Sequence, residues 1–190
     1  MEKFLPKKLQ DGATIGFLSV AGNVNDVTDI ENAREYFESL GYNVKISETT
    51  YQRKNYLCSS DKARAEALNS FFADETIDVI IACRGGYGSL RILDKIDYEL
   101  IKNNHKIFCG YSDITALQLM IYKKTGLITY NAPMIISDFA NDISEYTRDS
   151  FFAVLKNGIN AIKIDSPRVY SGGVVSGILW GGNLSTIQSL

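Results

Sequence analysis

The sequence has little of several residue types that mark particular functional classes. Its 190 residues include one histidine, three cysteines and one tryptophan. No apolar run approaches the ~20 residues that a membrane-spanning helix needs. The first residues also lack the apolar centre of a secretory signal. The cysteines are odd in number and widely spaced, which argues against a disulfide framework and against a zinc site. We therefore expect a cytoplasmic protein that contains neither a metal nor a cofactor.

The chain has no strong excess of charge of either sign. Lys and Arg together number 20 and Asp and Glu 22, so the formal net charge is −2. A nucleic-acid-binding surface would need a basic patch, and none is visible in this balance. The hydrophobic fraction of 45% is ordinary for a globular protein and is enough to form a core. A small or neutral partner is expected, without nucleic acid and without a membrane.

Strand-like and helix-like segments alternate along most of the chain. Strands are predicted over residues 14–20, 42–46, 77–83, 106–109 and 127–130, with helices over 61–73, 113–124 and 145–156 among them. This order predicts the α/β class, a mostly parallel sheet flanked by helices. The pattern changes after residue 157. We predict an α/β domain over 1–160 and the beginning of a β-rich C-terminal domain over 161–190, with a strand at 174–180 and an end before that domain is complete.

The most informative stretch is 106–117, which contains Ser112. It predicts a short buried strand, a tight turn that carries the serine, and a helix that begins at Asp113. This arrangement exposes a serine hydroxyl beside a helix N-terminus, where a nucleophile for acyl transfer is typically found. Ile114 stands where the second glycine of the usual motif would be. A simpler alternative also remains open, in which Ser112 or Asp113 only caps the helix.

A glycine-rich loop, Arg84–Gly88, follows the third predicted strand. Ligands of open α/β sheets bind outside the carboxyl ends of the strands, so this loop and the Ser112 turn should lie close together. The backbone N–H groups of Asp113 and Gly86 would then form an oxyanion hole. A plain left-handed turn and a phosphate-binding loop are the alternatives. Arg84 would bind a substrate carboxylate or pair with an acidic side chain.

The predicted serine lacks a base within this sequence. His105 precedes the fourth strand and Ser112 follows it, so at ~3.3 Å per residue they lie roughly 15–20 Å apart. A general base must come within ~3 Å. We therefore predict that His105 is a surface residue and that the base lies beyond Leu190 or on another chain. Asn131 follows the fifth strand and forms either the rim of the same cleft or a turn.

Two further features near the end of the chain have alternative interpretations. Trp180 is predicted to belong to the core. The segment Gly181–Asn183 forms either a turn or a close approach of backbone to the cleft.

These motifs together resemble the LD-carboxypeptidase family of serine peptidases, which includes microcin-immunity peptidases. The matching segments are 9–16, 84–88, 110–117, 124–127 and 179–184. The resemblance implies cleavage of the amide between an L- and a D-amino acid in cytoplasmic muropeptides, which recycles the peptidoglycan tetrapeptide to the tripeptide. It implies a Ser-Glu-His triad without metal, in which Ser112 is the nucleophile and Asp113 and Gly86 supply the oxyanion N–H groups. No residue here matches the family's Glu and His, which belong to its C-terminal domain.

The resemblance also implies the partners and the alternatives. Substrate-binding residues are predicted at Arg84, Gly85, Tyr87 and Asn131, with a muropeptide as the substrate and a homodimer as the expected assembly. The Arg84–Gly88 loop resembles the murein-recycling branch more than the microcin branch. Two other functions stay open: a deacylase that acts on peptidyl-nucleotides, and a non-catalytic domain that binds phosphate or nucleotide.

Overall fold

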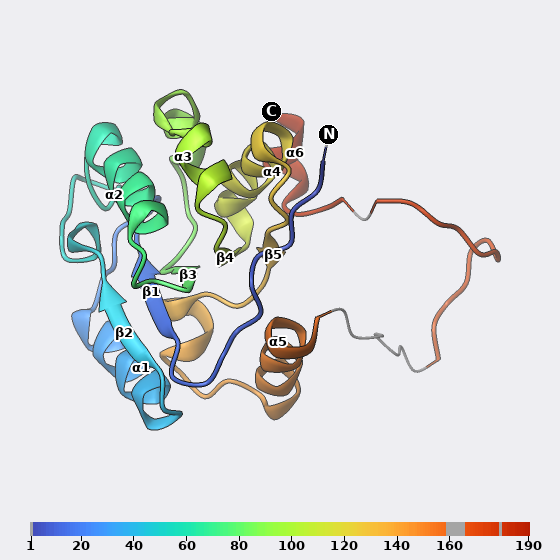
Figure 1. Cartoon of the computed structure of the whole chain (residues 1–190), viewed down its shortest axis with the longest axis horizontal. Coiled ribbons are helices and arrows are strands. Elements are labelled where there is room, and N and C mark those ends of the chain that lie inside the picture. The colour runs from blue at the N-terminus through green and yellow to red at the C-terminus, as the bar shows by residue number, and fades with distance from the viewer. Residues whose placement is uncertain (1, 159–165, 179) are drawn as a thin grey trace.

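The protein is an α/β fold built on one parallel sheet (Figure 1). The computed structural model describes residues 2–158, 166–178 and 180–190. The strand order is β2-β1-β3-β4-β5. The strands are β1 (Thr14–Leu18), β2 (Asn43–Ile46), β3 (Val79–Ala82), β4 (Ile107–Gly110) and β5 (Tyr130–Asn131). Each neighbouring pair runs parallel, which confirms the predicted fold class.

Helices cover both faces of the sheet. They are α1 (Val27–Ser39), α2 (Asp61–Ala73), α3 (Tyr98–Asn103), α4 (Thr115–Thr125), α5 (Glu145–Asn157) and α6 (Leu184–Gln188). Short 3-10 segments are η1 (Glu48–Thr50), η2 (Ser89–Lys95) and η3 (Ser112–Ile114), and a π-helical turn, η4, spans Ile135–Phe139. No helix among the described residues is both long and apolar enough to span a membrane.

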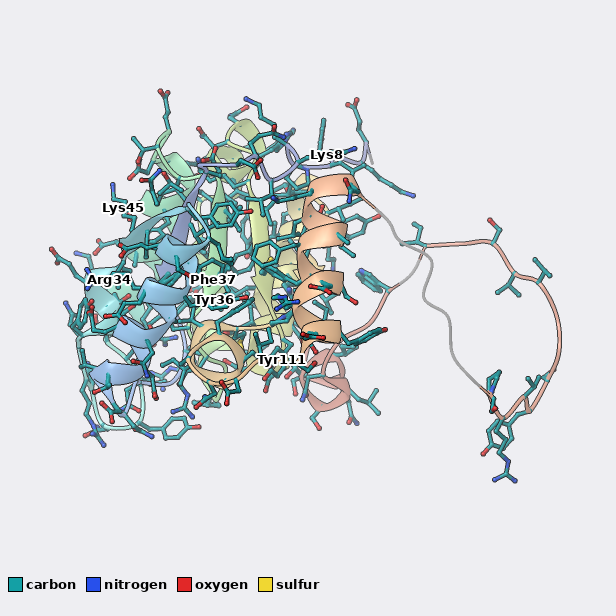
Figure 2. The ribbon with its side chains drawn as sticks, turned by 90° about the horizontal axis from the view of Figure 1, so that it is seen from below. Lys8, Arg34, Tyr36, Phe37, Lys45 and Tyr111 are labelled. Carbon is teal, nitrogen blue, oxygen red and sulfur yellow. The ribbon has the colours of Figure 1, made fainter. Side chains whose placement is uncertain are left out.

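Two hydrophobic cores lie on opposite faces of the sheet. One contains apolar side chains of α2, α3 and α4, and in it Phe72 packs against Phe108 with ring centroids 5.9 Å apart. The other contains those of α1, η4 and α5, where Phe37 packs against Phe139 with ring centroids 4.8 Å apart. Figure 2 labels Phe37 on α1. β3 and β4 are buried along their whole length, as central strands of a parallel sheet are. Residues that follow their carboxyl ends are thereby held on a rigid support.

The fifth strand lies later in the chain than predicted. The apolar pattern placed it at residues 127–130, whereas β5 is Tyr130–Asn131. The N-terminal segment accounts for the difference, because Phe4 N–H donates to the Gly126 carbonyl at 2.9 Å and Ile128 N–H donates to the Phe4 carbonyl at 2.9 Å. Residues 126–128 therefore pair with the N-terminal segment, and pairing with β4 begins only at Tyr130.

His105 lies at the end of the sheet opposite to Ser112, as the sequence indicated, but it is only partly exposed. Its ring stacks on Phe4, with centroids 4.6 Å apart, and its Nε2 is buried without a hydrogen-bond partner among the described residues. The prediction of a surface residue was wrong in this respect, because the N-terminal segment folds over the ring.

The C-terminal segment contains no strand where one was predicted. Residues 174–178 and 180 form no ladder, and Leu179 lies outside the described residues, as do residues 159–165 around the predicted domain boundary. Val174 and Val175 are fully exposed, and no strand runs beside them among the described residues. Trp180 is 59% exposed, with only an edge contact to Tyr122, so its assignment to the core was also wrong. The division at residue 160 stays a prediction.

Candidate active site

Ser112 lies on a strained turn between β4 and the helix that follows. The residue has φ +61°, a left-handed conformation that costs a non-glycine residue of order 1–3 kcal/mol. Gly110 makes the turn sterically feasible, because a Cβ at that position would lie 2.7 Å from Ile114 Cγ2. The chain then enters η3 and continues as α4. A strand, a serine with positive φ and a helix form the geometry of a nucleophile elbow.

Neither Ser112 nor Asp113 caps the helix that it begins. No side chain caps η3 or α4, so the simple capping interpretation is contradicted. The buried Asp113 carboxylate instead accepts a hydrogen bond from the backbone N–H of Ser89 at 2.9 Å. Ser89 is the first residue of η2, directly after the glycine-rich loop. This hydrogen bond ties the Ser112 turn to the loop after β3.

Gly85 is the residue of that loop that touches the serine. A Cβ at Gly85 would lie 3.0 Å from Ser112 Cβ, 3.2 Å from its Oγ and 3.3 Å from the backbone nitrogen of Asp113. Its carbonyl accepts from Gly22 N–H at 3.0 Å, so the loops after β1 and β3 are joined there. Gly86 and Gly88 have φ +112° and +117°, so the loop does contain left-handed turns. The absence of a side chain at Gly85 is what lets the loop lie against Ser112.

If Ser112 is the nucleophile that the sequence predicts, Gly85→Ala is expected to lower kcat of the acyl-transfer reaction by roughly 100-fold. The added methyl would displace Ser112 or cover the Asp113 N–H. Misplacing reacting groups by about 1 Å, or losing one oxyanion donor, lowers the rate by about this factor. Steady-state kinetics on the complete gene product measure it. Gly172→Ala is the matched control, because a Cβ there meets no atom within 4 Å. A Gly85→Ala enzyme with normal kcat would show that the loop does not position the nucleophile.

A cavity of about 390 Å³ opens beside the serine. It is lined by Tyr111, Ser112, Asn131, Gly182 and Asn183. Tyr111 lies toward the end of the sheet opposite to Lys8 (Figure 2). Asn131, the last residue of β5, thus shares a cavity with Ser112, as expected for the rim of a cleft. No histidine, carboxylate or lysine is among these lining residues.

The Gly181–Asn183 segment makes a close backbone approach to this cavity. Asn183 N–H donates to Thr115 Oγ1 at 3.0 Å, and a Cβ at Gly182 would clash with Thr115 Cγ2. Thr115 is the first residue of α4, so the segment rests on the turn that carries Ser112. The same Asn183 caps α6 by accepting from Thr186 N–H at 3.0 Å. Tyr111 and Thr115 were not among the site residues predicted from the sequence, although the glycine pair before Asn183 was a signal for the contact.

Arg84 and Tyr87 occupy different surroundings from those predicted. Arg84 is half-buried, and its Nη1 donates to the Asn23 carbonyl at 3.1 Å. It forms no ion pair within the described residues, so the predicted pairing with an acidic side chain was wrong. Tyr87 is 53% exposed and lines a separate recess rather than the Ser112 cavity. A role of either residue in substrate binding stays a prediction.

A fully buried arginine, Arg64, donates a hydrogen bond to the glycine-rich loop. Arg64 of α2 donates from Nη1 to the carbonyls of Val20 and, at 3.0 Å, of Gly88. Its Nη2 donates to Asp61 Oδ1 at 2.7 Å. The guanidinium therefore joins α2, the end of β1 and the end of the loop that touches Ser112.

The cysteines near the site are unsuited to replace Ser112 as nucleophile. Burial raises the pKa of the Cys83 thiol to about 11 and that of Cys58 to about 12, and it also raises the pKa of Cys109. All three are free and buried. A protonated thiol inside the core is neither nucleophilic nor accessible. The described residues also contain no group of three or more His, Cys, Asp or Glu side chains arranged to hold a metal ion.

The fold and the site define an α/β domain with a serine on a strand–turn–helix elbow. Residues 15–132 match the profile of the LD-carboxypeptidase N-terminal domain, and the chain belongs to the LD-carboxypeptidase family. The elbow, the glycine-rich loop and β5 all lie inside the matched range, which ends one residue after Asn131.

Individual relatives agree with this assignment. A Bacillus subtilis protein named "probable murein peptide carboxypeptidase" is 32% identical over 98% of this chain and 59% of its own length. The microcin C7 self-immunity protein MccF of Escherichia coli is 30% identical over 98% of this chain and 63% of its own length. The crystal structure of muramoyltetrapeptide carboxypeptidase from Oxalobacter formigenes superimposes with a TM-score of 0.80 at 28% identity, and the match covers 93% of this chain and 59% of that one. The chain thus spans about three-fifths of the length of these relatives. Two of them are named carboxypeptidases, which supports a peptide hydrolase at the level of the family.

Proposed function

We propose that this protein is a serine-type LD-carboxypeptidase. The observation that carries the proposal is Ser112 at φ +61° with Gly85 and the Asp113 nitrogen packed against it. Its substrate would be a muropeptide, whose terminal D-amino acid is removed during peptidoglycan recycling in the cytoplasm. Free, buried cysteines are compatible with that reducing compartment.

The proposed reaction is acyl transfer in two steps. Ser112 Oγ attacks the scissile carbonyl and loses its proton to a base, and the D-amino acid leaves with a proton on its amine. Water then hydrolyses the resulting ester and regenerates the serine. The developing oxyanion would accept hydrogen bonds from Asp113 N–H and Gly86 N–H. The Gly85 carbonyl and the Gly86 N–H belong to one trans peptide, so they point in opposite directions. The carbonyl accepts from Gly22 N–H, and the Gly86 N–H therefore points away from Gly22.

The base is proposed to come from outside the described residues. His105 precedes β4 and is covered by Phe4, whereas Ser112 follows that strand. The residues that line the Ser112 cavity include no base. A Glu and a His that complete the triad are therefore expected elsewhere in the complete gene product or on another chain.

The test is the release of the terminal residue from a peptide that ends in an L–D amide. We expect the complete gene product to release D-alanine from such a tetrapeptide and to leave the all-L isomer intact. A serine-reactive probe should label the protein, and Ser112→Ala should remove the label. Labelling that survives in Ser112→Ala would contradict the assignment of the nucleophile, and peptide that stays intact would contradict the reaction.

A second candidate is the deacylase activity on peptidyl-nucleotides. The observation in its favour is the similarity to MccF. MccF is 30% identical to this chain, and the Bacillus subtilis murein peptide carboxypeptidase is 32% identical. Turnover of a peptidyl-nucleotide with no turnover of the muropeptide would favour it. Nucleotide binding without either activity would instead favour the non-catalytic alternative.

A further inference from the structure

A second cavity lies beside the glycine-rich loop, apart from the one that holds Ser112. Its volume is about 480 Å³, and its walls include Lys54, Tyr56, Ser60, Asp61, Tyr87 and Arg91. These residues come from the turn after β2, the start of α2, the loop after β3 and η2. The two cavities share no lining residue. We call this second cavity the Lys54 recess.

The charges around the Lys54 recess are positive in a chain whose net charge is −2. Asp61 is its acidic residue, and two guanidinium groups already bind that carboxylate. Arg64 Nη2 lies 2.7 Å from Asp61 Oδ1, and Arg91 Nη2 lies 2.9 Å from Oδ2. The hydrogen bond from Arg91 lowers the pKa of the Asp61 carboxyl, so this group is ionised and fully used by its arginine partners.

Lys54 gives the recess a positive charge that no acidic side chain among the described residues neutralises. It is exposed, and no ion pair within the described residues includes it. The N-terminus of α2, a helix of 13 residues, adds a partial positive charge at Asp61. The recess therefore suits an anionic group, and the rings of Tyr56 and Tyr87, 54% and 53% exposed, provide apolar contact beside it.

The position of the recess indicates which part of a peptide reaches it. Gly85 touches Ser112, and Tyr87 follows two residues later, about 7 Å further along the chain at most. The α-carboxylate of a released terminal residue lies about 4 Å from the scissile bond on the leaving side, so it would stay in the Ser112 cavity, which shares no lining residue with the recess. A carboxylate two or three residues away on the acyl side has the required reach at ~3.5 Å per residue.

We propose that the Lys54 recess is a second substrate subsite, which binds a carboxylate on the acyl side of the peptide, two or three residues from the scissile amide. The proposal rests on the proposed peptidase function. It assigns to Lys54 the selection of acidic peptides, while Ser112 and its neighbours perform the reaction. Specificity and chemistry would then lie on opposite sides of the glycine-rich loop.

The test compares two peptides that differ only at that position, one with glutamate and one with glutamine. In the complete gene product, Lys54→Glu is expected to raise KM for the glutamate peptide about tenfold, and to leave its kcat and both constants of the glutamine peptide unchanged. Lys62→Glu is the matched control, because it makes the same charge change on the exposed face of α2, where Lys62 pairs with Glu66 at 3.7 Å. It should leave both peptides unaffected.

Binding to the Ser112→Ala variant separates the subsite from catalysis. Calorimetry should show tighter binding of the glutamate peptide, and Lys54→Glu should remove this preference. Equal effects of Lys54→Glu on both peptides, or an equal effect of Lys62→Glu, would overturn the subsite while the peptidase activity stands. Lys54-dependent binding of inorganic phosphate, with no preference for the glutamate peptide, would overturn it in favour of a phosphate site. If neither peptide is bound or cut, the peptidase function fails, and the subsite fails with it.

Discussion

Ser112→Gly is expected to remove the proposed peptidase activity and to stabilise the fold at the same time. Loss of the hydroxyl removes the nucleophile, which should lower kcat by roughly 10⁴-fold or more. The same change places glycine at φ +61°, where a side chain is strained. The free energy of unfolding should therefore rise by about 1 kcal/mol. Denaturant unfolding and peptide kinetics on the complete gene product measure the two effects.

Ser112→Ala is the control that separates the two effects. It removes the same hydroxyl but keeps a Cβ on the left-handed backbone, so activity should fall equally with no gain in stability. If glycine and alanine gave the same unfolding free energy, the turn at Ser112 would store no strain. The positive φ of Ser112 would then have no measurable cost in stability.

Arg64→Met is expected to lower the free energy of unfolding by about 2–5 kcal/mol, because two buried carbonyl groups lose their donor. The side chain is 0% exposed, and its loss leaves the Val20 and Gly88 carbonyls without their donor. Uncompensated buried polar groups pay their full desolvation cost. Because Gly88 ends the loop that touches Ser112, kcat should fall as well. Arg64→Lys, whose ammonium keeps the charge without the planar fork, should have an intermediate effect on both.

Arg91→Met provides the comparison, because Arg91 binds the same carboxylate from the surface. Its side chain is 49% exposed, so the loss should be below about 1 kcal/mol. Urea unfolding of the three variants against the parent protein tests this order. Equal losses for Arg64→Met and Arg91→Met would mean that burial of the guanidinium is not what stabilises the loop.

The strand predictions were confirmed where a continuous apolar run is buried on both faces of the sheet. Residues 79–82 and 107–110 are apolar on both faces, and they can form only buried strands between two layers of helices. Residues 127–130 and 174–180 look similar in local pattern, yet the first pairs partly with Phe4 and the described part of the second pairs with nothing. A strand needs a partner, and local periodicity contains no information about the partner.

The candidate site was predictable to the same extent and for the same reason. The turn at Ser112 and the glycines before it are local features, so the sequence alone determined the elbow and its position at a strand end. Only the tertiary structure decided that Gly85 touches Ser112, that Asp113 binds Ser89, and that Gly182 rests on Thr115. These contacts join residues that lie 24 positions apart, for Ser89 and Asp113, to 67 positions apart, for Thr115 and Gly182, and no periodic pattern links them. They depend on which strands lie side by side, and burial of the whole core determines that choice.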